Sequence, residues 1–169
     1  GLGIREKNDI YGAIRYLNTN HNVDKVGLYG ISYGAVAVID AAINHNNEKV
    51  NIVGVFADTP YFSVTELLTK EVSDRTPIPH FISKLLKFGI IQSGELFQNM
   101  NIEDVEISMK NINKIEYPLI IISCKNDERV PISHPERVYS YAKNSKYVPF
   151  DYCEDHGEAF ETNKEEFIK

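Results

Sequence analysis

The stretch KVGLYGISYGAVAVIDAAI, residues 25–43, decides the fold. Its first part, Lys25 to Tyr29, is a short apolar run typical of a strand, and its last part, Ala35 to Ile43, has the apolar content of a buried helix. Between them, Gly30 to Gly34 reads GxSxG. A strand, a sharp turn and a helix form a nucleophile elbow, in which small residues beside the serine let strand and helix meet and expose its hydroxyl. We therefore predict that Ser32 is a nucleophile, the alternative being a plain glycine-rich turn.

The rest of the chain repeats the alternation of strand and helix. Apolar spacing predicts a helix over Asn8 to Leu17, before the elbow. The same patterns predict strands over residues 50–57, 119–123 and 147–152, and helices over residues 135–142 and 159–169. Continuous Val and Ile content, as in the 50–57 strand, suits a sheet that is buried on both faces. The sequence thus predicts one α/β domain over residues 1–169, built on a parallel sheet.

Residues 60–117 interrupt this alternation. They contain a proline-rich turn at Thr76 to Pro79, a helical stretch from His80 to Phe88, and polar segments without a strand pattern. We interpret the range as a small helical cap inserted into the domain. Its large apolar side chains are candidates for a substrate pocket, although at helical spacing such residues more often serve only in packing: Phe62, Leu67, Phe81 and Phe88.

Composition limits the classes of partner. A chain of 169 residues with 43% hydrophobic content can bury the core of one domain. Its formal net charge of −6 leaves no surplus of Lys and Arg for a phosphate backbone, so nucleic acid is not an expected partner. No apolar run approaches the roughly 18 residues that a membrane span needs. We expect a soluble domain that acts on a small molecule, and the sequence gives no oligomeric state.

The ends and the cysteines suggest where the protein works. The sequence starts at Gly1 without a methionine, in what looks like a loop before a helix, so we expect further chain upstream. Cys124 and Cys153 lack CxxC spacing and are too few for a disulfide framework. Free thiols in a reducing compartment are the simpler expectation. We therefore predict a cytoplasmic location, and leave open an upstream targeting segment or membrane anchor.

A serine hydroxyl becomes a nucleophile when a histidine accepts its proton, and that histidine needs a carboxylate to orient it. Asp127 follows the predicted strand over residues 119–123, and His156 follows the one over residues 147–152. Reactive groups of open α/β sheets gather at the carboxyl ends of the strands. The separation of 29 residues suits one strand-helix-strand unit of about 30. We predict Asp127 as the acid and His156 as the base.

Other carboxylates and histidines remain open as alternatives. Asp58, at the end of the preceding strand, is the best alternative acid, and His134 is the alternative base because it also follows Asp127. His134 precedes a helix rather than following a strand, which favours His156. The remaining nearby acids are expected to be surface charges: Glu128, Asp151, Glu154 and Asp155. The remaining histidines are expected in solvated loops or at a helix start: His21, His45 and His80.

Five blocks stand in a familiar order: NDI at 8–10, GLYGISYG at 27–34, FADTPY at 56–61, PLIIISCKNDERVP at 118–131 and DHGEAF at 155–160. In these blocks the chain resembles the α/β-hydrolase superfamily. The resemblance is to its bacterial branch of small, cap-bearing, esterase-like hydrolases, which are related to serine aminopeptidases and prolyl-oligopeptidase catalytic domains. Two positions depart from that pattern. Cys124 stands where the family often has glycine, and Ala35 where a second glycine commonly follows the elbow.

The resemblance implies an α/β-hydrolase fold whose first strands, together with a loop supplying one oxyanion-hole N–H, precede Gly1. Within the chain, Tyr33 N–H is then the oxyanion donor. The implied reaction is acyl transfer: Ser32 attacks an ester or amide carbonyl, His156 moves the proton, Asp127 orients His156, and water releases the acyl group. No metal or organic cofactor is implied. A serine peptidase and a non-catalytic binding module that retains the fold remain the alternatives.

Overall fold

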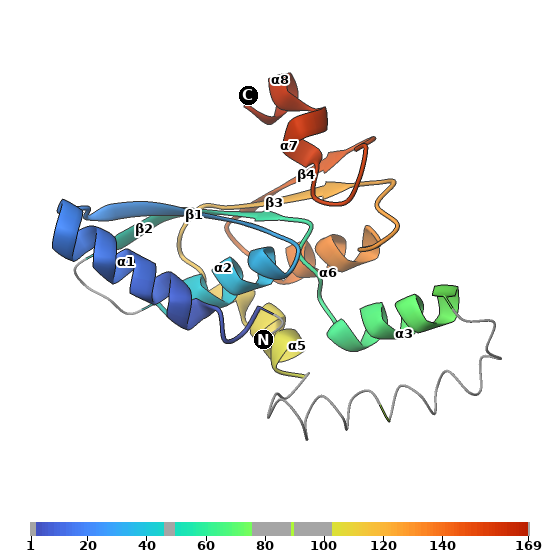
Figure 1. The fold of residues 1–169 in the computed structure, drawn as a ribbon, viewed down its shortest axis with the longest axis horizontal. Coiled ribbons are helices and arrows are strands. Elements are labelled where there is room, and N and C mark those ends of the chain that lie inside the picture. The colour runs from blue at the N-terminus through green and yellow to red at the C-terminus, as the bar shows by residue number, and fades with distance from the viewer. Residues whose placement is uncertain (1–2, 46–49, 76–88, 90–102, 169) are drawn as a thin grey trace.

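A computed structural model of the chain describes residues 3–45, 50–75, 89 and 103–168. Its centre is a parallel sheet whose strands follow one another in chain order (Figure 1). The strands are β1 (Lys25–Ile31), β2 (Asn51–Asp58), β3 (Leu119–Cys124) and β4 (Ser145–Phe150). All their carboxyl ends therefore lie at one edge of the sheet. The prediction of a parallel α/β sheet is confirmed.

Helices lie on both sides of this sheet (Figure 1). On one side are α1 (Lys7–His21), α2 (Tyr33–Ile43), α3 (Val64–Arg75), α5 (Asp104–Lys110), the 3-10 helix η1 (Ile112–Lys114) and α6 (Ser133–Tyr141). On the other side are the short helices α7 (Ala159–Thr162) and α8 (Lys164–Phe167). Of the helices that the structure describes, none is both long and apolar enough to cross a membrane.

Alternating residues of β3 divide the interior into two cores, because successive side chains of a strand point to opposite faces. Leu119 and Ile121 belong to the larger core, which α2 covers. Ile122 and Cys124 belong to the smaller one, together with Ala159 of α7. Apolar side chains on both faces explain why this strand reads as a continuous apolar run.

The C-terminal helix differs from the prediction. Residues 159–169 were expected to form one helix, but α7 and α8 are separated at Asn163, whose backbone (φ −121°, ψ 37°) is not helical. The Asn163 side-chain amide donates a hydrogen bond to the Tyr152 carbonyl at 3.0 Å. Asparagine side chains compete with the helical ladder in this way, so the expectation of one continuous helix is wrong.

Both ends of the range predicted as a cap belong to the main core. Phe62, at the start of the range, and Met109 and Ile112, near its end, are fully buried among the strand residues. Phe62 therefore serves in packing, and Leu67 packs against the same core. The expected turn at residues 76–79, the helix at 80–88, Phe81 and Phe88 lie outside the described residues. An inserted cap stays a prediction, confined to the residues between these buried ends.

One buried carboxylate joins three helices. Asp40 of α2, 3% exposed, accepts a hydrogen bond from Ser108 Oγ of α5 at 2.6 Å and pairs with Lys7 Nζ of α1 at 2.8 Å. Asn44 Nδ2 also donates to this carboxylate, at 3.1 Å. A buried charge is tolerated only when it is paired and hydrogen-bonded. The network therefore fixes α1 and α5 against α2, the helix that begins directly after Ser32.

Replacing Asp40 by alanine should lower the free energy of unfolding by about 3 kcal/mol, because Lys7 and Ser108 lose their partner. Urea unfolding followed by circular dichroism measures the change. Asp151→Ala is the matched control, since Asp151 pairs with Lys125 on the exposed surface and exposed pairs contribute little. Equal unfolding midpoints for the wild type and Asp40→Ala would contradict the assigned role.

Candidate active site

Ser32 lies between β1 and α2 in a backbone conformation that few residues adopt. Its φ of 57° is left-handed, but its ψ of −118° belongs neither to the left-handed helical region nor to extended backbone, and such conformations typically cost about 1–3 kcal/mol. Its N–H donates a hydrogen bond to the Asp58 carbonyl at the end of β2, at 2.8 Å. Its own carbonyl accepts one from Ala35 N–H, at 3.0 Å. Bonds from the neighbouring strand and the following helix thus hold the turn.

The two glycines of the GxSxG pattern are not equivalent. A Cβ added at Gly30 would lie 2.2 Å from the carbonyl oxygen of Gly34, so only glycine lets the strand approach the first turn of α2. A Cβ added at Gly34 would meet no atom of the described structure within 4 Å. The expectation that both flanking residues must be small thus has a steric basis at Gly30 alone.

This difference can be measured with a matched pair of variants. Gly30→Ala should cost about 3 kcal/mol or more, because the clash is with backbone that cannot move aside. Gly34→Ala should be neutral or stabilise the protein by up to about 1 kcal/mol, because alanine is the better helix former. Thermal and urea unfolding of both variants provide the comparison. A Gly30→Ala variant as stable as Gly34→Ala would show that the elbow is looser than described.

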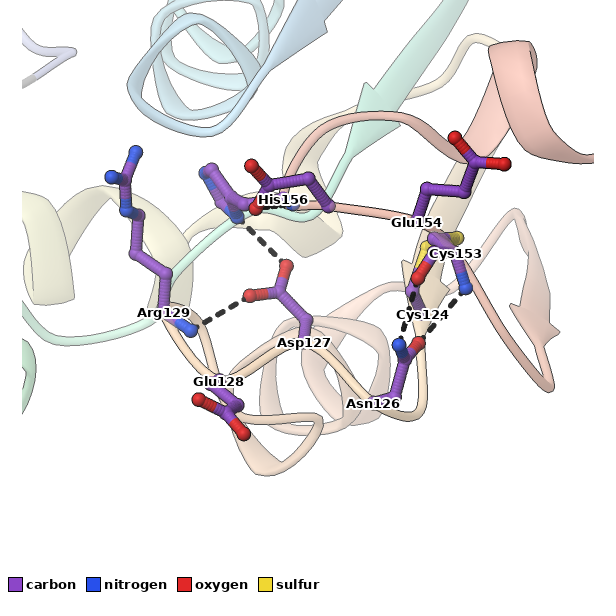
Figure 2. A pocket seen from close by; sticks show the side chains of 9 residues that line it. Cys124, Asn126, Asp127, Glu128, Arg129, Cys153, Glu154 and His156 are labelled. Carbon is purple, nitrogen blue, oxygen red and sulfur yellow. Dashed lines mark hydrogen bonds and ion pairs between the residues drawn. A yellow bond between two sulfur atoms is a disulfide. The ribbon is translucent and has the colours of Figure 1, made fainter.

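Asp127 and His156 are in direct contact (Figure 2). His156 Nδ1 lies 2.7 Å from Asp127 Oδ2, and the side chains are 9% and 1% exposed. The other carboxylate oxygen accepts hydrogen bonds from the backbone N–H groups of Arg129 and Val130, both at 2.9 Å. An ionised carboxylate only accepts hydrogen bonds, so Nδ1 carries a proton, and in the neutral imidazole Nε2 is then left as an acceptor. This is the tautomer that a general base requires.

The loop carrying His156 also contacts the elbow. Gly157 has a φ of 81°, and a Cβ added there would lie 2.8 Å from Cγ2 of Ile31, the residue before Ser32. His156 Nε2 is buried and has no hydrogen-bond partner within the described part of the chain. Bonds between catalytic groups are often long until substrate binds. The loop that carries His156 thus approaches the residue before Ser32, and no hydrogen bond joins His156 to Ser32 among the described residues.

Tyr33, the predicted oxyanion donor, is the first residue of α2. Its backbone N–H donates no hydrogen bond among the residues that the structure describes, as expected for the first turn of a helix. The partial positive charge at a helix N-terminus favours a nearby negative charge. The position thus has the free donor that an oxyanion requires.

Asp58, the alternative acid, has different partners. Its fully buried carboxylate accepts hydrogen bonds from Tyr29 Oη at 3.2 Å and Thr59 Oγ1 at 2.9 Å. Burial raises the pKa of the Asp58 carboxyl, although these two hydrogen bonds and the nearby His156 oppose the shift. The imidazole of His156 is hydrogen-bonded to Asp127 instead. Between the two candidate acids, the geometry favours Asp127.

His134, the alternative base, is buried at the start of α6. Its Nδ1 accepts a hydrogen bond from Phe62 N–H at 3.3 Å, and its Nε2 lies 4.0 Å from Glu66 Oε2. Burial lowers the pKa of the His134 imidazole, against the opposing effect of Glu66. Since Phe62 lies just before α3 and Glu66 lies in its first turn, His134 joins α6 to the start of α3 and has the contacts of a structural residue.

Because the folded state keeps His134 neutral, its contribution to stability should be present above pH 6.5 and lost as pH falls below that value. His134→Ala should therefore lower the free energy of unfolding by about 2 kcal/mol at neutral pH. It should also flatten the pH dependence of unfolding, and leave turnover per folded molecule intact. Urea titrations on both sides of pH 6.5 test this, with His21→Ala as the exposed control. An unchanged pH slope in His134→Ala would contradict it.

The other candidates are placed as follows. His21 is exposed, His45 Nε2 lies 2.9 Å from the Val50 carbonyl, and His80 lies outside the described residues. Asp151 pairs with Lys125 on the surface. A cavity of about 290 Å³ lies between the loop after β3 and the loop after β4 (Figure 2). The predicted surface charges Glu128, Glu154 and Asp155 line it. The full lining consists of Cys124, Asn126, Asp127, Glu128, Arg129, Cys153, Glu154, Asp155 and His156.

Cys124 and Cys153 form a disulfide, with their Cα atoms 5.8 Å apart. The expectation of free thiols is therefore wrong. In the β3–β4 register Cys124 is opposite Phe150, and the chain returns Cys153 to its side three residues later. The spacing of the cysteines along the sequence does not show this return. Because the two thiols are joined, they no longer support the expectation of a reducing compartment.

Solved structures establish the fold class. The chain matches an esterase of Pyrococcus furiosus, Pf2001, with a TM-score of 0.69 at 19% identity, over 98% of this chain and 59% of the esterase. It matches an acylaminoacyl peptidase of Pyrococcus horikoshii with a TM-score of 0.61 at 18% identity, over 95% of this chain and 25% of the peptidase. The fold is that of the α/β hydrolases.

The family follows from the sequence. Residues 11–141 match the family model described as BAAT / Acyl-CoA thioester hydrolase C terminal, and the chain belongs to this family. It is also 24% identical over 170 residues to the uncharacterized protein YqkD of Bacillus subtilis (strain 168). That match covers 99% of this chain and 53% of YqkD, so the chain spans about half the length of this relative.

Proposed function

We propose that the chain carries the catalytic residues of a serine hydrolase that cleaves carboxylic esters, or the related thioesters and amides, through an acyl-enzyme. The observation that carries the proposal is the 2.7 Å contact between His156 Nδ1 and Asp127 Oδ2. It leaves Nε2 of the imidazole as a free acceptor, in a loop whose Gly157 closely approaches Ile31, the residue before the strained Ser32. An ion pair with only a structural role on the surface would not require side chains that are 9% and 1% exposed, nor a histidine whose Nε2 is left free to accept a proton.

Each residue has one role in the proposed reaction. Ser32 Oγ attacks the substrate carbonyl while His156 Nε2 accepts its proton, and the negative oxygen that forms is stabilised by Tyr33 N–H. His156 then gives the proton to the leaving group, and the acyl-enzyme remains. In the second half, His156 takes a proton from water, which attacks the acyl group, and returns it to Ser32. Asp127 holds the imidazole throughout and stabilises its charged form.

The relatives indicate which leaving groups to test. The Pyrococcus furiosus protein is named an esterase, the Pyrococcus horikoshii protein an acylaminoacyl peptidase, and the family description names acyl-CoA thioesters. These reactions all transfer an acyl group and differ in whether an alcohol, an amine or a thiol departs. Turnover of p-nitrophenyl esters, acyl thioesters and aminoacyl anilides should be compared. Ester hydrolysis is the activity we expect, and a peptidase is the second candidate.

In the full-length protein, a fluorophosphonate probe should label the wild type and not Ser32→Ala, since the probe reacts only with activated serines. His156→Ala should abolish ester hydrolysis, and Asp127→Asn should fold normally but lose on the order of 10⁴ in turnover through loss of the correct tautomer. Asp151→Asn, which changes an exposed carboxylate nearby, is the control. Near-native turnover in Asp127→Asn would shift the role of acid to Asp58, and an unlabelled wild type would favour a binding module.

A further inference from the structure

The disulfide occupies equivalent positions in the two catalytic loops. Cys124 precedes Asp127 by three residues, and Cys153 precedes His156 by three residues. Cys124 is the last residue of β3, and Cys153 lies three residues beyond the end of β4. A covalent bond therefore joins the loop after β3, which carries Asp127 (the acid loop), to the loop after β4, which carries His156 (the base loop). In each loop the cysteine lies three residues before the proposed catalytic residue.

Asn126 joins the same two loops by hydrogen bonds (Figure 2). Its Nδ2 donates to the Cys153 carbonyl at 2.7 Å, and its Oδ1 accepts from Cys153 N–H at 2.9 Å. One side-chain amide thus satisfies both backbone groups of Cys153, as a neighbouring strand would. The contact fixes the distance and the orientation of the base loop relative to the acid loop.

Little else fixes these loops to each other. The last backbone hydrogen bond between them runs from Lys125 N–H to the Phe150 carbonyl, at 2.9 Å. Beyond it, within the described residues, the loops share no backbone–backbone hydrogen bond. The Lys125–Asp151 pair is exposed and adds little. Apart from the His156–Asp127 hydrogen bond itself and the close approach of Gly157 to Ile31, the described connections that set the position of His156 relative to Asp127 are therefore the disulfide and Asn126.

We propose that Asn126 and the Cys124–Cys153 disulfide are positioning residues that hold His156 on Asp127, and that turnover depends on the redox state of this disulfide. The proposal rests on the catalytic roles proposed above for Asp127 and His156. A misplacement of about 1 Å in a catalytic group can cost on the order of 10² in rate. Loosening both connections should therefore affect kcat far more than KM.

The redox step is an ordinary thiol–disulfide exchange. A thiolate of a dithiol reductant attacks one sulfur of the disulfide, forms a mixed disulfide with that cysteine and releases the other cysteine. The second thiol of the reductant then attacks the mixed disulfide and frees the first cysteine. Two electrons and two protons convert the Cys124–Cys153 bond into two thiols, and the reductant becomes a disulfide. Both cysteines line the 290 Å³ cavity between the loops but are 1% exposed, so the reductant reaches a sulfur only when the loops part locally. Asn126 remains in place after reduction, so reduction alone should loosen the loops only in part.

The test compares full-length wild type and Asn126→Ala, each before and after treatment with a dithiol reductant. Asn144→Ala is the matched control, because the Asn144 amide donates to the Glu116 carbonyl at the opposite end of the strands. For a p-nitrophenyl ester, reduction or Asn126→Ala alone should each lower kcat by less than about tenfold, and both together by on the order of 10² or more, with KM changed by about twofold at most. Asn126→Asp, which keeps the acceptor for Cys153 N–H, should lie between wild type and Asn126→Ala.

A second readout does not depend on catalysis. The low-field proton NMR signal of a histidine N–H bound to a carboxylate reports the His156–Asp127 contact directly. It should persist in the oxidised wild type and disappear in reduced Asn126→Ala. If that signal and kcat both survive in reduced Asn126→Ala, the proposal is overturned. If the oxidised wild type does not react with a fluorophosphonate, the proposed function fails, and the NMR signal alone still decides whether these residues position His156.

Discussion

A backbone hydrogen bond from Ser32 N–H to the Asp58 carbonyl connects the serine to the sheet. It continues the β1–β2 ladder by one residue, since Ile31 is already opposite Asp58, and helps to hold Ser32 in its strained conformation. The Asp58 side chain is fixed in turn by Tyr29 and Thr59. Buried Asp58 therefore supports the serine with its backbone and β1 with its carboxylate, which explains a costly buried acid that is not hydrogen-bonded to the imidazole.

The parallel arrangement of the strands makes the site possible. Ser32 follows β1, Asp58 ends β2, Asp127 follows β3 and His156 follows β4, so each strand brings one polar group to the same edge of the sheet. Groups that are far apart in the sequence are gathered there, even though residues 59–118 separate β2 from β3. The backbone hydrogen bonds between strands end where the strands end, and the proposed catalytic groups lie just beyond that point. The loops that carry these groups therefore depend on side-chain connections.

The features predicted from the sequence are those that depend on residues close to one another along the chain. The strand-turn-helix at GxSxG located Ser32, and strand ends located Asp127 and His156, because the alternation of strand and helix dictates where loops leave a parallel sheet. The disulfide and the bonds of Asn126 were not predictable, since both depend on how β3 and β4 pair. The break at Asn163 depends on the Tyr152 carbonyl nearby, and the tolerance at Gly34 depends on space around it. A pattern of residue types reveals neither the carbonyl near Asn163 nor the space around Gly34.

The order of the strands has a consequence for biosynthesis. Because β1 to β4 neighbour one another in both the sheet and the chain, each strand can dock as soon as it emerges from the ribosome, and domains generally fold from the N-terminal side during synthesis. The serine turn is then complete while the imidazole is still untranslated. A nascent chain of this kind holds the proposed nucleophile before its proposed base exists. Under those roles, reactivity would arise only after His156 has been made and has docked, which protects the unfinished protein and its neighbours from premature acylation.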